Sequence, residues 1–478
     1  MILKRKAKII CTIGPSSSSP SCIAKLIQAG MDIARLNFSH GDYPEYKKII
    51  RNIRSQSKKI GKFVAIMQDL QGPKIRVGDL KNKGVRLKSG QTLYITTRKV
   101  IGDQSEISIP YHALPHLLKR GNSILLDDGL IELEVLSTSS TRLKCCVKVG
   151  GFLKEHKGVN LPYIKSRTVA LTGKDKKDLK FALKEGVDMI ALSFVRSAHD
   201  ILVLKNLIPH NKNMCVVAKI EKPEAFDDLD NIIKVSDAVM VARGDLAVES
   251  STEAVPRLQK QIIMRCNRAL KPVITATQML ESMIEQARPT RAEASDVANA
   301  IFDGSDCLML SGETAVGKYP VRAVATMHKI ICEAEKAQDI QDPQEAIRSK
   351  IDRLILGQSE RIRATEKAAC EIAHEVGARL ICCLTEKGTS AKLIARGRPL
   401  QPIIAFTHQE KTIRLLSLVW GVRAYLYTDL LKSKKLFKSI RDKLLNMRLV
   451  KKNDRIVITT GLFIGSGDTD RIVKLHKI

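Results

Sequence analysis

Residues 215–242 read CVVAKIEKPEAFDDLDNIIKVSDAVMVA, and they contain one complete strand–helix–strand unit. Two apolar runs, Cys215–Ile220 and Ala238–Ala242, have the length of buried strands, and the segment Ala225–Val235 between them has apolar residues at helical spacing. Strands without polar alternation are typical of parallel sheets that are covered on both faces. The stretch therefore predicts a parallel α/β fold.

The same pattern extends in both directions from this unit. Further apolar runs of strand length are Lys8–Ile13, Ala34–Phe38, Phe63–Leu70, Met189–Phe194, Pro272–Thr277 and Cys307–Ser311. Segments with helical periodicity lie between most of the runs, at Ser21–Gly30, Tyr43–Lys59, Lys174–Gly186 and Pro256–Ala269. Eight parallel β/α units of this kind close into a barrel, so the predicted fold class is α/β with a (β/α)8 TIM barrel.

One interval between predicted strands, from Leu70 to Met189, is too long for a single β/α unit. Within it, the segments 84–97, 122–136 and 141–149 alternate like short strands, with turns at 88–90, 127–129 and 137–140. We therefore expect a small all-β domain at 73–167, inserted between barrel segments 1–72 and 168–344.

A third domain is expected at 345–478. A long helical region from Val321 to about Gln358 leads into it, and helix Thr365–Gly377 follows. Its predicted strands are Arg379–Leu384, Pro402–Phe406, Ala424–Tyr427 and Arg455–Thr460. Strands with helices packed between them indicate a C-terminal open-sheet α/β domain.

The composition, 44% hydrophobic and 27% charged over 478 residues, excludes disordered and collagen-like classes. No apolar run reaches the roughly 18 residues of a membrane span. The first residues lead directly into a strand-like run instead of a signal sequence, so we expect a cytoplasmic protein with no membrane contact. The 11 Cys form no C-x-x-C pair, which argues against a disulfide framework or a zinc site.

The net charge is +30, and ten basic residues lie between Lys432 and Arg455 against only Asp442 and Asp454. This segment has an amphipathic helical pattern with Leu431, Leu444 and Leu445. Because only one aromatic residue, Phe437, lies among the charges, we interpret the segment as a solvated helix face and do not expect a nucleic-acid partner.

Barrel enzymes place their chemistry at the C-terminal ends of the strands, and here these ends are polar. Glu221 and Asp245 follow adjacent strands and offer the hard oxygen ligands that suit Mg²⁺. Lys219 lies two residues before Glu221, so both side chains leave the same face of the strand. Arg35 can bind a phosphate in a fork, and Lys219 can meet charge on a transferring group.

Other strand ends extend this polar set. The backbone N–H groups of Gly244 and Asp245, with the Thr277 hydroxyl, can bind a substrate carboxylate. Asn37, Ser39 and Asp69 offer oxygens to a monovalent cation, and His40 either caps a turn or touches ligand. Together these residues predict a small, highly anionic substrate.

The motifs that carry these residues resemble those of the pyruvate kinase family. They are ICTIGP at 10–15, ARLNFSHG at 34–41, KIEKP at 219–223, RGDL at 243–246, ATQMLESM at 276–283, RPTRAE at 288–293, DVANA at 296–300 and SGETA at 311–315. The resemblance covers almost the whole chain. It implies transfer of the phosphoryl group of phosphoenolpyruvate to ADP, giving ATP and pyruvate in the last step of glycolysis, with Mg²⁺ and usually K⁺.

The resemblance also implies roles for individual residues. Lys219, Arg35 and Thr277 are the implied catalytic residues, and they bind phosphoenolpyruvate together with Gly244 and Asp245. The implied Mg²⁺ ligands are Glu221 and Asp245, and the implied K⁺ ligands are Asn37, Ser39, Asp69 and the backbone carbonyl of Leu70. Asn37, His40, Arg76 and Lys157 are implied to bind the nucleotide, which makes the inserted domain a lid that closes on ADP. The family further implies a homotetramer.

One departure from the family pattern concerns K⁺. Where many members read Thr-Lys-Gly-Pro-Glu after the strand-three Asp, this chain has Leu70-Gln71-Gly72-Pro73-Lys74. The Glu is associated with potassium dependence, whereas the ammonium of Lys74 can itself supply a positive charge. We therefore predict that K⁺ is weakly required.

Two loops of the third domain resemble the family's effector site. The first contains Thr385, Lys387, Gly388, Thr389 and Ser390, and the second contains Gly465 and Gly467. A loop before a helix start can hold a phosphate. We predict an allosteric site for a phosphorylated effector, either a sugar monophosphate or AMP.

Two alternatives come from other functional classes. One is a Mg²⁺-dependent aldolase or lyase on a related barrel, although such an enzyme needs neither the lid domain with Lys157 nor the nucleotide-type loop after the first strand. The other is a basic scaffold or RNA-binding protein with an inert barrel, although the complete set of Arg35, Lys219, Glu221, Asp245 and Thr277 argues against inertness.

Overall fold

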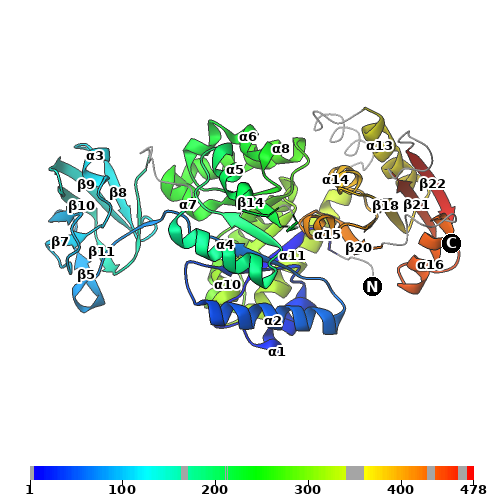
Figure 1. The fold of residues 1–478 in the computed structure, drawn as a ribbon, viewed down its shortest axis with the longest axis horizontal. Helices are drawn as coiled ribbons and strands as arrows, with labels where there is room; N and C mark the ends of the chain where they lie inside the picture. The colour runs from blue at the N-terminus through cyan, green and yellow to red at the C-terminus, as the bar shows by residue number, and fades with distance from the viewer. Residues whose placement is uncertain are drawn as a thin grey trace.

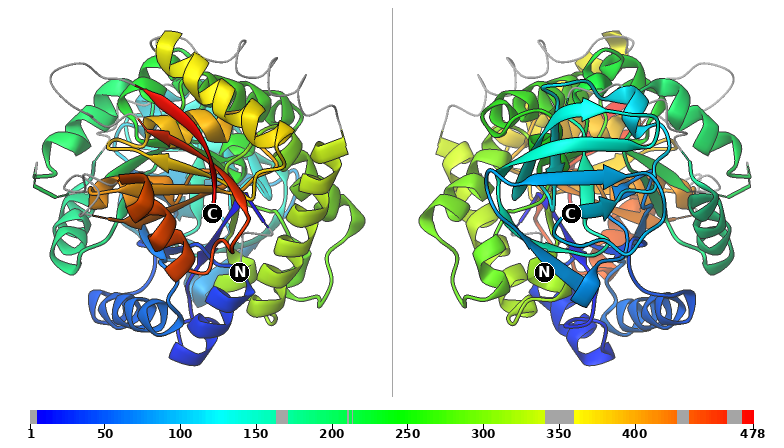
Figure 2. Two further views of the ribbon diagram at one scale, coloured as in Figure 1. Left: turned by 90° about the vertical axis from the view of Figure 1, so that its right-hand side faces the viewer. Right: turned by 90° about the vertical axis from the view of Figure 1, so that its left-hand side faces the viewer.

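The computed structural model describes residues 5–162, 171–209, 211–212, 214–340, 360–427, 436–460 and 471–478. Three bodies lie in a row along the long axis of the molecule (Figure 1). The inserted β strands form one end, the barrel lies in the middle and the C-terminal sheet forms the other end. Viewed along this axis, the inserted strands lie over one mouth of the barrel (Figure 2).

The barrel is closed by eight parallel strands in the order β1-β17-β16-β15-β14-β13-β3-β2. Their bounds are Lys8–Thr12 (β1), Ile33–Asn37 (β2), Ala65–Asp69 (β3), Met189–Leu192 (β13), Cys215–Ile220 (β14), Ala238–Ala242 (β15), Val273–Ala276 (β16) and Cys307–Leu310 (β17). Each strand lies within one of the predicted apolar runs or begins one residue before it. The predicted (β/α)8 barrel is confirmed.

The barrel helices surround these strands. Their bounds are Pro20–Ala29 (α1), Tyr43–Ile60 (α2), Gly173–Glu185 (α4), Ala198–Asn206 (α5), Leu229–Val235 (α6), Arg243–Glu249 (α7), Val255–Arg268 (α8), Arg291–Phe302 (α9), Gly312–Ala315 (α10) and Pro320–Ile340 (α11). Residues 341–359, where the long helical region was predicted to continue, lie outside the described residues.

Two apolar clusters explain why the strands lack polar alternation. On β1, Ile10 belongs to the cluster inside the barrel. Its neighbours Ile9 and Cys11 belong to the cluster between the strands and the surrounding helices. Since both faces of the strand are buried, an apolar residue is favoured at every position.

Local sequence fixes where the helices begin and end. The Asp42 carboxylate accepts a hydrogen bond from the Glu45 N–H at 2.9 Å, which starts α2, and Gly61 ends it with a left-handed φ of 69°. A capping box between Thr172 and Asp175 starts α4, directly after the chain returns from the inserted strands.

The inserted strands form a seven-stranded sheet, β4-β12-β8-β9-β10-β6-β7, and a two-stranded sheet, β11-β5. Their bounds are Ile75–Arg76 (β4), Gly84–Leu87 (β5), Thr92–Thr96 (β6), Glu106–Ser108 (β7), Ser123–Leu126 (β8), Ile131–Thr138 (β9), Arg142–Val149 (β10), Gly151–Lys154 (β11) and Gly158–Asn160 (β12), with a short helix at Leu114–Leu117 (α3). Strands occur in all three predicted segments. The two strands of segment 84–97 do not pair with each other. Instead, β5 pairs with β11 and β6 pairs with β10.

The C-terminal sheet has five strands in the order β20-β19-β18-β21-β22, which confirms the predicted α/β domain. The strand bounds are Leu380–Leu384 (β18), Ile403–Thr407 (β19), Val422–Leu426 (β20), Arg455–Thr460 (β21) and Ile472–Lys477 (β22), and the helices are Glu360–Glu375 (α13), Thr389–Arg396 (α14), Glu410–Leu416 (α15) and Leu436–Asn446 (α16). Strand β22 was not predicted. It is an antiparallel edge strand, and its polar residues Lys474 and His476 interrupt the apolar run that marked the other strands.

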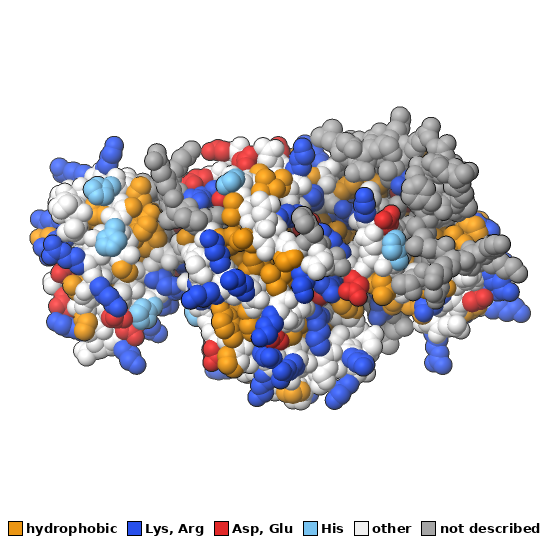
Figure 3. Space-filling model, in the orientation of Figure 1, with side chains coloured by type: hydrophobic (Ala, Val, Ile, Leu, Met, Phe, Trp, Pro, Cys, Tyr) orange, Lys and Arg blue, Asp and Glu red, His pale blue; other side chains and the backbone are white. Residues whose placement is uncertain are grey.

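The predicted basic helix needs a correction. Among the described residues of this segment the helix spans Leu436–Asn446, and Arg455 is the first residue of strand β21. Leu431 and Lys432 lie outside the described residues. Lysines and arginines are spread over all three bodies on the face shown in Figure 3, so the positive charge is not confined to this helix.

All 11 cysteines are free, as predicted. None of the helices in the described part of the chain is both long and apolar enough to cross a bilayer.

Candidate active site between the barrel and the inserted strands

A cavity of about 550 Å³ lies between the C-terminal ends of the barrel strands and the inserted sheet. It collects most of the predicted site residues. Those that line it are Arg35, Asn37, Ser39, His40, Asp69, Leu70, Lys74, Arg76, Lys157, Lys219, Glu221 and Asp245.

Lys219 lies at the centre of the polar cluster, near the end of β14. Its Nζ lies 2.8 Å from Glu221 Oε1 and 3.2 Å from Asp69 Oδ1. Nζ also donates a hydrogen bond of 2.7 Å to Ser193 Oγ. Burial alone would lower the pKa of Lys219, but the carboxylates of Asp69 and Glu221 raise it above its usual value. The ammonium is therefore charged and held in one place.

Arg35, on β2, is oriented by two neighbours. Its Nε and one terminal nitrogen lie 2.8 and 2.7 Å from Asp69 Oδ2, and the other terminal nitrogen donates to Thr12 Oγ1 at 2.9 Å. Burial would raise the pKa of Asp69, but Lys219 and Arg35 together hold it below its usual value. One buried carboxylate thus fixes two cations that face the cavity.

Glu221 and Asp245 suit a divalent cation. Glu221 is 1% exposed, and burial raises its pKa to about 7 against the opposing effect of Lys219. Its Oε2 accepts a hydrogen bond from the Phe194 N–H at 2.5 Å, whereas Oε1 receives no aligned hydrogen bond from the described residues. Both acidic side chains line the cavity, and carboxylate oxygens are the ligands that Mg²⁺ prefers, so the residues fit that ion.

Gly244 and Thr277 do not line this cavity. They lie beside each other, and the Gly244 N–H donates to Thr277 Oγ1 at 2.8 Å. Thr277 has a left-handed φ of 71°, and Arg243 holds its carbonyl oxygen at 2.7 Å. Two of the three predicted carboxylate-binding groups, the Gly244 N–H and the Thr277 hydroxyl, are therefore bonded to each other next to Asp245.

Arg76, Lys157 and His40 lie on the outer part of the cavity. Arg76 donates to the His156 carbonyl at 2.8 Å, and Lys157 Nζ lies 2.7 Å from Asp127 Oδ1. Burial and the neighbouring cations Arg76 and Lys74 lower the pKa of His40. This part of the cavity is consequently rich in positive charge, which suits the phosphates of a nucleotide.

The predicted K⁺ ligands line the same cavity, but several already have partners. Asn37 Oδ1 accepts from the Ser39 N–H at 3.3 Å. The Leu70 carbonyl accepts from Ser193 Oγ at 2.8 Å, and Asp69 is bound by Arg35 and Lys219. Lys74 Nζ lies 3.2 Å from Asp245 Oδ1 in the same cavity.

The predicted effector loop lies between β18 and α14. Gly388 has a left-handed φ of 81°, and its N–H donates to Thr385 Oγ1 at 3.0 Å. Lys387 is exposed, and Thr389 begins α14. Ser390 accepts from Arg471 at 3.2 Å. Gly465 and Gly467 lie outside the described residues.

Ser193 and Asp128 are among the residues of the site that sequence reasoning missed. Ser193 bonds both Lys219 and the Leu70 carbonyl, and it follows strand β13, so the strand-end rule used for the other strands would have found it. Asp128 was predicted only as part of a turn, although it lines the cavity. Nothing in the local sequence indicated that this turn lies against the barrel.

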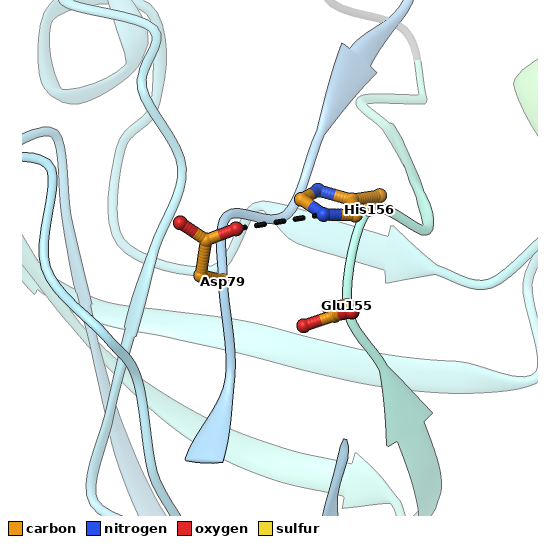
Figure 4. Close-up of side chains that lie close together, drawn as sticks. All are labelled: Asp79, Glu155 and His156. Atoms are coloured by element: carbon orange, nitrogen blue, oxygen red, sulfur yellow. Dashed lines mark ion pairs between the residues drawn. The ribbon is translucent and has the colours of Figure 1, made fainter. Parts of the chain in front are cut away.

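A cluster of metal-ligating side chains lies on the inserted strands (Figure 4). His156 Nε2 lies 3.4 Å from Asp79 Oδ1, and Glu155 is close to both. Asp79 and His156 are more than half exposed, and Glu155 and His156 line the same cavity as Glu221 and Asp245. Exposed groups of this kind are common without a metal, and we assign no role to them.

Comparison with known proteins shows what this arrangement is similar to. The family profile "Pyruvate kinase, barrel domain" matches residues 4–324, and the profile "Pyruvate kinase, alpha/beta domain" matches residues 363–474. Curated pyruvate kinases from Staphylococcus saprophyticus and Geobacillus stearothermophilus are each 43% identical, over 99% and 100% of this chain and 80% and 81% of their own lengths. A crystal structure of a pyruvate kinase from Cryptosporidium parvum has a TM-score of 0.90 and 38% identity, covering 99% of this chain and 96% of the other.

Proposed function

The chain belongs to the pyruvate kinase family of phosphotransferases, and we propose that it transfers the phosphoryl group of phosphoenolpyruvate to ADP in a Mg²⁺-dependent reaction. The products are ATP and, after protonation of the enolate, pyruvate. One observation carries the assignment of residues. Arg35, Lys219, Glu221 and Asp245 line one cavity that is faced by Arg76 and Lys157.

Phosphoryl transfer requires positioning and charge neutralisation more than covalent catalysis. Arg35 and Lys219 are the two cations fixed by Asp69, so they are arranged before substrate enters. We assign Lys219 to the charge that develops on the transferring phosphoryl group, and Arg35 to the phosphate of phosphoenolpyruvate.

Glu221 and Asp245 are the proposed Mg²⁺ ligands. The ion would neutralise negative charge on the substrate oxygens. Thr277, with the N–H groups of Gly244 and Asp245, is proposed to bind the substrate carboxylate, and we place protonation of the enolate on the Thr277 side.

Arg76, Lys157, Asn37 and His40 are the proposed nucleotide contacts. Arg76 and Lys157 belong to the inserted strands and Asn37 and His40 to the barrel, so ADP would bind between the two bodies. Closure of the inserted domain as a lid would exclude water, which otherwise competes with ADP as the acceptor.

We further propose that the monovalent cation requirement is weak. Lys74 supplies a positive charge inside the cavity, and Asp69, a proposed K⁺ ligand, is bound to Arg35 and Lys219. Asn37, Ser39 and the Leu70 carbonyl complete the site at which K⁺ would bind.

The whole chain is proposed to form three domains. We divide it at 1–72 and 168–344 for the barrel, 73–167 for the lid and 345–478 for the C-terminal domain. The loop of Thr385, Lys387, Gly388, Thr389 and Ser390 is proposed to bind a phosphorylated effector, a sugar monophosphate or AMP, together with Gly465 and Gly467. Its support is the turn at Gly388 directly before the start of α14. We propose a cytoplasmic homotetramer.

The test is pyruvate formation from phosphoenolpyruvate and ADP with Mg²⁺, measured for the wild type and for Lys219→Met. Loss of one preorganised charge in a buried site lowers kcat by about 10²–10³-fold in comparable enzymes, and we expect at least that. Lys205→Met is the matched control, because Lys205 pairs with Asp237 outside the cavity. Undiminished activity of Lys219→Met would contradict the assignment.

A further inference from the structure

The inserted strands and the barrel meet at a group of charges around Lys74. This residue directly precedes β4, the strand by which the chain enters the lid. Its Nζ lies 3.2 Å from Asp245 Oδ1 at the start of α7 and 3.6 Å from Asp128 Oδ1 in the turn between β8 and β9. One ammonium therefore bridges a barrel carboxylate and a lid carboxylate.

Gly158, on the strand by which the chain leaves the lid, leaves room for this bridge. A Cβ added at Gly158 would come within 2.8 Å of Lys74 Cε and 3.7 Å of Asp128 Oδ1. The Gly158 carbonyl also accepts a hydrogen bond from the Asp127 N–H at 3.1 Å, which fixes the turn to this strand. Asp128 is thus held beside the Lys74 side chain by its own backbone.

The other groups of the turn have different contacts. Asp127 pairs with Lys157 at 2.7 Å, and Gly129 lies near Val248 of α7, because a Cβ there would be 3.9 Å from that side chain. Asp128 is the carboxylate of the turn that faces Lys74.

The two carboxylate partners of Lys74 are not equivalent. Asp245 is a proposed Mg²⁺ ligand, and a carboxylate that binds a divalent cation attracts an ammonium less strongly. Asp128 is then the carboxylate partner of Lys74 that does not bind the metal.

We propose that Asp128 is a positioning residue, which holds the Lys74 ammonium in the active-site cavity so that it acts as a built-in monovalent cation. The lid turn thereby helps to position the positive charge of Lys74 at the mouth of the barrel. This inference rests on the proposed function, and specifically on the weak requirement for K⁺.

The first experiment measures the ratio of kcat at saturating K⁺ to kcat in a tetramethylammonium salt of equal ionic strength. We expect a ratio within about twofold for the wild type. For Asp128→Asn we expect a ratio of about fivefold or more, since fivefold is the lower end of the usual coupling factors between two binding sites. Gly158→Ala keeps every charge but displaces Lys74 Cε, so its ratio should rise as well. Asp128→Glu should restore a ratio close to that of the wild type.

Glu134→Gln is the matched control, because it removes a carboxylate that pairs with Lys148 within the lid at 2.8 Å. Its ratio should equal that of the wild type. A purely structural role for Asp128 would change stability without creating a response to K⁺.

The second experiment is independent of catalysis. In the metal-free protein, amide hydrogen exchange at Ile75–Arg76 and Gly158–Asn160 should be faster in Asp128→Asn and in Lys74→Met than in the wild type. The double variant should exchange no faster than the faster single variant, since both remove the same contact.

The outcomes separate this inference from the function on which it rests. A wild type with little response to K⁺, together with an Asp128→Asn variant that behaves identically in both experiments, overturns the role of Asp128 alone. Strong activation of the wild type by K⁺ overturns both the weak requirement and the positioning role. A wild type that forms no pyruvate overturns the proposed function itself.

Discussion

Asp69 shows how a single buried carboxylate arranges the charges of the site. It is 1% exposed and contacts both Arg35 and Lys219, two buried cations that would otherwise repel each other. Its position at the C-terminal end of a predicted strand identified Asp69 from sequence as an oxygen ligand for K⁺. Its role in holding two cations depends on contacts from strands β2 and β14, which lie far apart in the chain.

We expect Asp69→Asn to destabilise the protein by about 3–5 kcal/mol, because breaking a buried ion pair leaves uncompensated charge. The measurement is the thermal unfolding midpoint of the purified variant. Asp230→Asn, which removes a 78% exposed carboxylate that pairs with Arg265, should leave the midpoint near that of the wild type. Equal midpoints for the two variants would contradict the expectation.

The lowered pKa of Lys8 predicts that the stability of the protein depends on pH. Burial lowers its pKa from 10.5 to about 8, and Nζ donates to the Val422 carbonyl at 2.7 Å. Between these two pH values the unfolded chain binds the proton and the folded protein does not, so stability rises as pH increases from about 8 to 10.5. A single group contributes at most about 1.4 kcal/mol per pH unit over this window.

The test compares chemical unfolding of the wild type and Lys8→Met at several pH values in this range. The difference between the two slopes isolates Lys8, since the other titrating groups, including Lys392, are common to both proteins. Parallel slopes would show that Lys8 keeps its ordinary pKa when the protein is folded.

At the scale of elements, helix α4 links the lid to the barrel. The Thr172 Oγ1 accepts from the Asp175 N–H at 3.1 Å, and Asp175 Oδ2 accepts from the Thr172 N–H at 2.9 Å. The second oxygen of Asp175 accepts from the Gly72 N–H at 3.1 Å. The start of α4 therefore also holds the segment that enters the lid.

Thr172→Ala should lower stability by about 0.5–2 kcal/mol, the usual cost of removing an N-cap side chain. Because Asp175 loses a donor, we also expect faster hydrogen exchange at the Gly72 amide. Thr138→Ala, at the exposed end of β9, is the control and should change neither quantity. A Thr172→Ala protein with wild-type stability would exclude this cap as a determinant.

For the whole molecule, the contact between the barrel and the C-terminal domain contains a buried ion pair. Arg396, the last residue of α14, binds both oxygens of Asp306 at 3.1 and 2.9 Å, and the exposed fractions of the two side chains are 1% and 0%. Asp306 also accepts from the Trp420 N–H at 3.1 Å. The proposed effector loop and the barrel strand β17 are thus joined by one short helix and one ion pair.

Arg396→Met should destabilise this contact by about 3–5 kcal/mol, because Asp306 is left buried without its cation. Trp420 is the single tryptophan of the chain and lies in the contact, so its fluorescence reports on it directly. We expect the fluorescence change on heating to shift to lower temperature in Arg396→Met. An unchanged transition would show that the ion pair does not hold the two bodies together.

The chain sequence by itself determined the barrel, the presence of inserted and C-terminal strands, and most of the site. It did so because buried parallel strands are apolar at every position, as at Cys215–Ile220, and because closure of the barrel brings strand ends such as Arg35, Lys219 and Asp245 to one mouth. Only the tertiary structure decided the pairing of β5 with β11, the presence of edge strand β22 and the contact of Asp128 with Lys74. These features depend on contacts between segments far apart in the chain, and such contacts leave no periodic pattern in the local sequence.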